Sequence, residues 1–208
     1  MLHLATVDKA TLKLLKSLSS RKELQDFSLA GGTGLALQLG HRVSVDLDFF
    51  THTPFDSNRL FEYLREFYTV RNCTQSANSL SLFIEMETQE IKVDFLRHNY
   101  KLLQPNRIDG HIRIFSMEDI GAMKLNAIAN RGAKKDFYDI YALLKIFSLN
   151  QLLEFFQQKY EQFNSFTVVK SLAYFVDADL EPDPICLKGT RWEEIKKTLR
   201  SRVKGINI

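Results

Sequence analysis

The chain has 208 residues, of which 45% are hydrophobic and 25% are charged, and its formal net charge is +3. This composition is typical of a soluble globular protein, and the length allows one large domain or two small ones without disulfide staples. The charge is too small to establish a nucleic-acid partner, although it permits a local basic surface. The two cysteines, Cys73 and Cys186, lie far apart and outside any CxxC motif, so we expect neither a disulfide framework nor a cysteine zinc site.

Membrane features are also missing from the sequence. The N-terminal residues mix leucine with charged side chains, so they contain no signal-peptide core. No apolar run approaches the roughly 20 residues that a membrane-spanning helix needs. We therefore expect a cytoplasmic protein without a membrane partner.

The first half of the chain predicts a mixture of helices and strands. Leucines at helical spacing predict an amphipathic helix over residues 8–25. The elements expected after it are a short strand at 27–30, a short helix at 33–39 ended by Gly40, a strand at 44–50, a helix at 58–68 capped by Asp56 or Ser57, and strands at 69–74, 79–86, 90–97 and 111–115. These elements alternate as they do in an α+β domain.

The second half predicts helices alone. Residues 116–119 form a capping-box pattern that opens a helix through Arg131, and Gly132 separates this helix from another at 134–147. Further helices are expected at 150–163, 165–177 and 190–203. We therefore expect an α+β core over residues 1–115 and a helical region over 116–208 packed on it, with a soft boundary near 112–116.

Two aspartates one residue apart are the most informative motif. Side chains alternate along a strand, so Asp46 and Asp48 point the same way while Val45, Leu47 and Phe49 point into the core. Two like charges this close need a counterion, and Mg²⁺ held by carboxylates and substrate phosphates is the usual one. An edge strand whose polar face meets solvent explains the acids equally well.

A glycine-rich turn shortly before these acids favours the metal interpretation. Gly31 and Gly32 let the backbone approach a ligand closely, and Thr33 opens a helix whose free N–H groups and dipole favour phosphate. A lone Gly-Gly is common in turns, and neither a Walker-A motif nor GxGxxG is present. The turn and the acids together indicate a metal and phosphate site.

Asp94 is the natural third carboxylate. It lies on a predicted strand that can be adjacent to the first acidic strand, and three acids on adjacent strands would bind two metal ions for phosphoryl transfer. Taken alone, Asp94 is explained as an ordinary exposed strand residue.

Charged residues gather on the two helices that follow. Lys124 and Arg131 are seven residues apart, and therefore on one helix face, where they can hold a triphosphate; the alternative is that both are solvated basic residues. Lys135, Asp136 and Asp139 open the next helix, where simple ion pairing worth about 0.3–0.5 kcal/mol per pair is the alternative explanation.

His41 and Arg42 directly precede the acidic strand. Either residue can contact a phosphate or orient an acid, and the alternative is an ordinary turn. A functional role is favoured for Arg42, whereas the two explanations are balanced for His41.

Two stretches together resemble the AbiEii/AbiGii toxin family of nucleotidyltransferases, within the DNA-polymerase-β-like nucleotidyltransferase superfamily. The first runs from Leu29 to Phe50 and contains the Gly-Gly turn and the paired aspartates. The second runs from Asp119 to Ile140 and is the more specific part. Residues 171–179 are also similar to the family, so the resemblance covers about residues 20–200.

The resemblance implies a mixed sheet with flanking helices, followed by a C-terminal helical bundle. It also implies metal-dependent transfer of a nucleotide from an NTP to an acceptor. By position, Asp46 and Asp48 match the family's metal-binding pair, and Gly31 and Gly32 match its phosphate-cradling turn. The other matches are Lys124 as the NTP-contacting lysine, Asp136 as the later catalytic acid, and Arg131, Lys135 and Asp139 within the same motifs. Some superfamily members have Gly-Ser in the turn, and Thr33 is the residue here that can replace that hydroxyl.

These residues lead to three hypotheses. The first is a nucleotidyltransferase dependent on Mg²⁺ or Mn²⁺ that acts as the toxin of a bacterial toxin–antitoxin (abortive infection) pair, with an RNA end such as that of tRNA as acceptor and an antitoxin encoded nearby. In the second, the same reaction modifies a protein or a small molecule. The third is a nucleotide-binding or interaction protein without turnover, and the cost of an unpaired acid pair without a metal argues against it.

Overall fold

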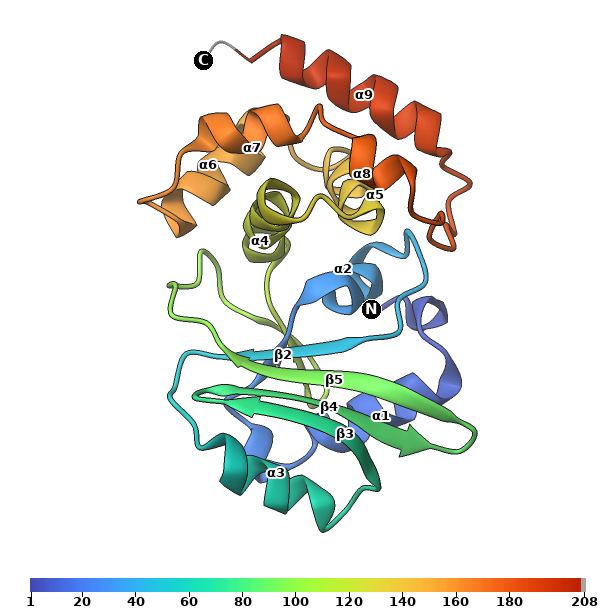
Figure 1. Cartoon of the computed structure of the whole chain (residues 1–208), viewed down its shortest axis with the longest axis vertical. Coiled ribbons are helices and arrows are strands. Elements are labelled where there is room, and N and C mark those ends of the chain that lie inside the picture. The colour runs from blue at the N-terminus through green and yellow to red at the C-terminus, as the bar shows by residue number, and fades with distance from the viewer. Residues whose placement is uncertain (207–208) are drawn as a thin grey trace.

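A computed structural model of the chain describes residues 1–206, and it contains one mixed sheet between helical layers (Figure 1). The strands are β1 (Ser28–Leu29), β2 (Leu47–Thr51), β3 (Val70–Ser76), β4 (Ser79–Met86), β5 (Gln89–Arg97), β6 (Arg107–Asp109) and β7 (Ile112–Ile114). Their order in the sheet is β3-β4-β5-β2-β1-β7-β6. The α+β class and the mixed sheet expected from the sequence are therefore confirmed.

The helices form layers on both faces of this sheet. They are α1 (Lys9–Ser19), α2 (Gly31–Leu39), α3 (Ser57–Arg65), α4 (Met117–Asn130), α5 (Lys134–Leu143), α6 (Leu149–Lys159), α7 (Ser165–Ser171), α8 (Val176–Asp179) and α9 (Trp192–Lys204), with 3₁₀ turns at Leu4–Thr6 and Lys22–Leu24. Helices α1 and α3 contact the sheet on one face, whereas α2 lies between β2 and the pair α4 and α5 (Figure 1). The C-terminal helices lie beyond α4 and α5.

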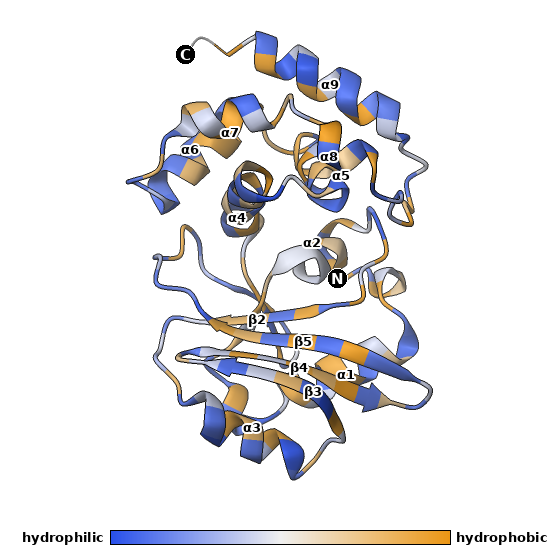
Figure 2. Ribbon diagram, in the orientation of Figure 1, coloured by the Kyte–Doolittle hydropathy of each residue, from blue (hydrophilic) through white to orange (hydrophobic). Residues whose placement is uncertain are grey.

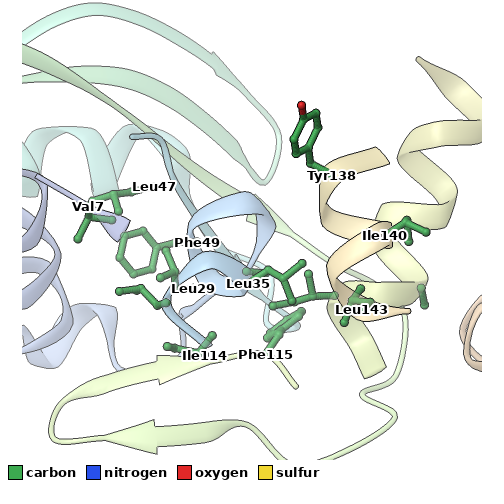
Figure 3. Close-up of a cluster of buried hydrophobic side chains, with 14 of the residues drawn as sticks. Val7, Leu29, Leu35, Leu47, Phe49, Ile114, Phe115, Tyr138, Ile140 and Leu143 are labelled. Carbon is green, nitrogen blue, oxygen red and sulfur yellow. The ribbon is translucent and has the colours of Figure 1, made fainter. Parts of the chain in front are cut away.

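The core follows from the apolar periodicity of each element. Leu47 and Phe49 alternate with Asp48 and Phe50 along β2, and the first two are buried. Figure 3 shows part of this core, where Leu29, Leu35 and Phe49 lie together. Helix α9 is mainly hydrophilic in Figure 2, because only a narrow stripe of it, including Ile195 and Leu199, is buried.

The register between β2 and β5 places the predicted acidic residues. The two strands are parallel neighbours, and Asp48 lies directly opposite Asp94. Paired residues on adjacent strands project from the same face, so these two carboxylates are on the face that α2 and α4 cover. The expectation that Asp94 lies on a strand beside the first acidic strand is confirmed.

Some element boundaries differ from the sequence expectations. Strand β2 begins at Leu47, so Asp46 precedes it, and Val45, which was expected to point into the core, is 55% exposed. The chain before β2 bonds elsewhere: the N–H of Ser44 donates to the carbonyl of Thr6, and that of Val43 donates to Ile185. These bonds hold residues 43–45 outside the sheet.

Three further differences have local causes. Strand β6 was not expected, because it is a three-residue edge strand whose middle residue, Ile108, is 68% exposed. The helix expected at 165–177 is divided into α7 and α8. Helix α2 begins at Gly31, so the two glycines form its first turn and do not precede it.

A buried ion pair fixes the start of α4. The hydroxyl of Ser116 accepts the N–H of Asp119 at 3.0 Å, which confirms the predicted cap. The fully buried carboxylate of Asp119 lies 2.6 Å from the Nζ of Lys159 in α6 and accepts the N–H of Leu103 at 3.0 Å. Helix α4, which carries Lys124, is thereby tied to α6 and to the loop after β5. Within the described residues, no helix is both long and apolar enough to cross a membrane.

His98 lies in an aromatic cluster where β2 and β5 end. Its ring is 5.7 Å from that of Phe50 and 5.2 Å from that of Tyr100, and its Nε2 has no hydrogen-bond partner within residues 1–206. Burial, aided by the charge of Lys159, lowers the pKa of His98 to about 4. The imidazole is therefore neutral in the folded protein at pH values where the unfolded chain protonates it.

This difference predicts an acid-sensitive fold. The contribution of His98 is fully present above its unfolded pKa of 6.5 and is lost as the pH falls toward 4. We expect the free energy of unfolding to be lower by about 2 kcal/mol at pH 5 than at pH 7 through this residue, since one pKa unit corresponds to about 1.4 kcal/mol. Denaturant titrations should show a smaller pH dependence for His98→Phe and an unchanged one for His111→Gln at an exposed site. Equal pH dependence in all three proteins would contradict this explanation.

Candidate active site

A pocket of about 310 Å³ lies where α2, β2, β5 and α4 meet. Of the residues predicted for the site, its lining contains Gly31, Gly32, Arg42, Asp46, Asp48, Asp94, Lys124, Arg131 and Lys135. Thr33, Asp136 and Asp139 do not line it. The pocket therefore joins segments from three separated parts of the sequence.

Asp48 is an acid of the pocket whose carboxylate has no polar partner among the described residues. Burial raises the pKa of Asp48, and the charges of Asp94 and Asp46 raise it further, although Lys124 opposes them. Asp46 is half-buried, with the Nζ of Lys135 3.7 Å away. This pair of carboxylates is therefore short of positive charge.

The oxygen ligands of Asp46 and Asp48 fit a Mg²⁺ ion. Mg²⁺ is usually bound by one or two carboxylates together with substrate phosphates and water, and does not need a cage made of protein alone. A divalent cation would also compensate the burial of Asp48 and the repulsion from Asp94 and Asp46, which together raise the pKa of Asp48. Among residues 1–206, no group of three or more His, Cys, Asp or Glu side chains is already placed to hold a metal.

Asp94 differs from the other two acids because it already has polar partners. Its carboxylate accepts the hydroxyl of Ser81 at 2.5 Å and lies 2.7 Å from the Nζ of Lys92. The hydrogen bond that Lys92 donates to Asp94 is the main cause that raises the pKa of Lys92. The role of Asp94 as a metal ligand stays a prediction, and Lys92 is a pocket residue that the sequence motifs did not indicate. The signal was present, since Lys92 is two residues before Asp94 on the same face of β5.

The glycines provide space and backbone donors. Gly31 has a φ of +60°, and a Cβ there would overlap the carboxylate of Asp48, with the Cγ of that residue only 2.9 Å away. Ala30, at the N-cap of α2, offers no side-chain cap to the first N–H groups of the helix. These N–H groups lack helical acceptors, so they are free to donate to a phosphate.

Thr33 has a structural position that the sequence did not predict. It is fully buried, and its hydroxyl hydrogen-bonds to the Oγ of Ser44 at 2.9 Å and to the carbonyl oxygen of Asp46. The hydroxyl group that lines the pocket is that of Ser44. Thr33 therefore holds the segment that carries Asp46, and it does not replace a phosphate-contacting hydroxyl.

Lys124 is held by two carboxylates from the next helix. Its side chain is only 6% exposed, and its Nζ lies 2.8 Å from the Oδ1 of Asp136 and 2.6 Å from the Oδ2 of Asp139. Burial favours the neutral amine, but the charges of Asp139 and Asp136 outweigh it and raise the pKa of Lys124. The lysine is therefore charged at neutral pH.

Asp139 binds three side chains at once. Besides Lys124, it accepts the Nε of Arg42 at 2.6 Å and the Nη2 at 2.9 Å, and the Nε2 of His41 lies 2.7 Å away. Burial opposes ionisation of Asp139, but Lys124 and Arg42 hold its pKa well below the ordinary value. Asp136 is also fully buried and accepts the Nε of Arg131 at 2.9 Å.

These pairings leave the phosphate side of the pocket positive. Arg42, Lys124 and Arg131 carry three charges, whereas the two carboxylates that hold them, Asp136 and Asp139, carry two. The acids are turned toward the helices, and the cations line the pocket. This arrangement favours an anionic ligand next to the Asp46 and Asp48 pair.

A second and larger pocket, of about 470 Å³, lies on the other side of His41. Its lining contains one acid, Glu194, which accepts the hydroxyl of Tyr141. Paired carboxylates and the free helix N-terminus belong to the smaller pocket, so size alone does not identify the site.

The fold and the smaller pocket have the features expected of a nucleotidyltransferase: a mixed sheet presents paired acids beside a glycine turn, under helices that supply cations. The sequence profile described as "Nucleotidyl transferase AbiEii toxin, Type IV TA system" matches residues 13–204. The chain belongs to this family of nucleotidyltransferase toxins, which confirms the resemblance read from its motifs.

Individual proteins also resemble the chain in sequence or in fold. The uncharacterized protein aq_aa25 of Aquifex aeolicus is 37% identical over 191 residues, which span 86% of this chain and 87% of that protein. JHP933 from Helicobacter pylori has a TM-score of 0.60 and 19% identity, over 95% of this chain and 92% of that one. MenT4, a nucleotidyltransferase toxin from Mycobacterium tuberculosis, has a TM-score of 0.54 and 14% identity, over 95% and 84% of the two chains. At these identities the two solved structures show a shared fold.

Adding a methyl group at Gly31 tests whether the pocket needs the space that this glycine leaves for the Asp48 carboxylate. We expect Gly31→Ala to weaken binding of a Mg²⁺–NTP complex at least about tenfold, because the new Cβ displaces the carboxylate. Gly110→Ala is the matched control, since Gly110 has the same φ of +60° but nothing within 4 Å of an added Cβ. In both variants the free energy of unfolding should fall by about 1 kcal/mol, because alanine is forced into a left-handed backbone conformation. Calorimetric titration with a non-hydrolysable NTP measures the difference, and equal affinities would contradict it.

Proposed function

We propose that the chain transfers a nucleotide from an NTP to an RNA end, such as that of a tRNA, in a reaction that requires Mg²⁺ or Mn²⁺. In this proposal the protein is the toxin of a bacterial toxin–antitoxin pair. The single observation that carries it is the meeting of Asp46 and Asp48, the free N–H groups of Gly31 and Gly32, and the charged Lys124 in one pocket. Family membership supports the toxin role and an antitoxin encoded by a neighbouring gene.

Each side of the pocket has its own task in this mechanism. Asp46 and Asp48 would hold the metal ion, which when bound would neutralise charge on the reacting phosphate and polarise it. The N–H groups of Gly31 and Gly32 donate to phosphate oxygens. Lys124, with Arg42, Arg131 and Lys135 around it, neutralises the charge that develops on the leaving pyrophosphate.

Asp94 is the proposed acceptor-side group. It lies opposite Asp48, and Ser81 and Lys92 hold its carboxylate in place. The acceptor oxygen bonds to the α-phosphorus while the bond to pyrophosphate breaks, and the proton of the acceptor hydroxyl passes to Asp94. Asp136, the other acid predicted for this role, is fully buried between Lys124 and Arg131, so we assign it the positioning of those two cations.

An RNA acceptor is supported by cations that reach solvent at the pocket. The side chains of Lys92, Lys135 and Arg131 are 40%, 46% and 57% exposed. Side chains of this kind contact nucleic-acid phosphates and so position a strand without reading its sequence. An acceptor on a protein or a small molecule uses the same pocket and remains the alternative.

Removal of Asp46 tests the reaction and the acceptor together. Wild-type protein incubated with labelled NTPs, total RNA and lysate protein should label the RNA pool. We expect Asp46→Ala to reduce this labelling at least about 100-fold, because an acid that holds the metal is lost. The side chain of Asp46 is 38% exposed, so the variant should keep its fold.

The exposed Asp109, on the edge strand β6, provides a matched control. Asp109→Ala should label RNA at the wild-type rate. Full activity in Asp46→Ala would overturn the assignment of the site, whereas labelled protein in place of RNA would overturn only the acceptor.

A further inference from the structure

One end of the pocket is apolar. Phe50 follows Asp48 by two residues on β2, and Leu96 follows Asp94 by two residues on β5, so both project from the face that carries the acids. The strand register places Phe50 directly opposite Leu96. A pair of carboxylates is therefore followed, one step along the same face, by a pair of apolar side chains, and all four line the pocket.

Helix α4 completes this apolar end. Met123 and Ala127 are four residues apart, hence on one face of the helix, and both line the pocket. Phe50, Leu96, Met123 and Ala127 are all half-buried. We call these four residues the apolar shelf.

Phe50, the aromatic residue of the shelf, packs against two other rings. The ring of Phe50 lies 5.7 Å from that of His98 in an edge-to-face arrangement and 6.0 Å from that of Phe115. His98 and Phe115 are both buried. Phe50 is therefore a preorganised aromatic surface that remains partly open beside the charged part of the pocket.

We propose that the apolar shelf is the subsite for a nucleobase, an inference that rests on the proposed function and adds the part of the substrate that the charged residues do not contact. A base is planar and apolar on its faces. Stacking on an aromatic side chain therefore stabilises a bound base whichever of the four bases it is. The four shelf side chains carry no hydrogen-bonding group, so they hold a base by stacking and van der Waals contact. The base belongs either to the NTP or to the terminal nucleotide of the acceptor RNA.

Binding measurements with and without a base test this subsite. The probes are a non-hydrolysable NTP, inorganic tripolyphosphate and a short RNA oligonucleotide, each titrated calorimetrically with Mg²⁺ into the full chain. We expect Phe50→Ala to weaken the NTP about tenfold and to leave tripolyphosphate unchanged, and Phe50→Trp to restore NTP affinity. Met123→Ala, on the other wall, should act in the same direction. Phe55→Ala, at a half-buried phenylalanine outside the pocket that packs on Phe27, is the matched control.

Each outcome has a defined meaning. Weakened RNA binding with unchanged NTP binding supports the shelf and assigns the base to the acceptor. Unchanged binding of both NTP and RNA in folded Phe50→Ala and Met123→Ala overturns the shelf. A third outcome is that the wild-type protein binds NTP no better than tripolyphosphate and that neither variant binds RNA more weakly. The shelf is then not a base subsite, and the proposed reaction stands. If the wild-type protein binds neither NTP nor tripolyphosphate, the proposed function itself fails, and the shelf fails with it.

Discussion

The carboxylate of Asp139 is the contact on which the rest of the site depends. It is fully buried, and a buried carboxylate is costly unless cations and hydrogen bonds compensate it. The compensating groups are Lys124 of α4 together with Arg42 and His41, which precede β2. One buried charge therefore joins α5, α4 and the segment leading to the sheet, and it holds two cations at the edge of the pocket.

The opposite wall of the pocket follows from the sheet. Parallel pairing of β2 and β5 sets Asp48 beside Asp94, and Gly31 is the residue that leaves room for the first of these carboxylates. The sheet thus contributes acids, while the helices contribute cations that are held from behind by their own acids. A metal ion and a triphosphate, the ligands of the proposed reaction, would be complementary to these two walls.

The sequence predicted the fold class, the family and most of the pocket, because these depend on local patterns. Capping at Ser116, the glycines, and the alternation of β5 are all visible in short windows of residues. Spacing does not show which side chains of different elements meet, so the buried roles of Asp136 and Asp139 and the apolar shelf were not foreseen. The alternation of Asp46 with Asp48 predicts that Asp46 lies within the strand, whereas bonds from neighbouring residues to Thr6 and Ile185 hold that segment outside the sheet. The division of the chain near residue 115 stays a prediction.

The affinity of Asp139→Asn for tripolyphosphate shows most directly whether Asp139 holds the cations of the pocket in place. If Asp139 acts by holding Lys124 and Arg42 in place, the variant should bind tripolyphosphate at least about tenfold more weakly than wild type, and the free energy of unfolding should fall by about 3–5 kcal/mol. Loss of a negative charge by itself would strengthen the binding of an anion, so the two explanations predict opposite signs. Unchanged or tighter binding in the folded variant would show that Asp139 does not hold Lys124 and Arg42 in place.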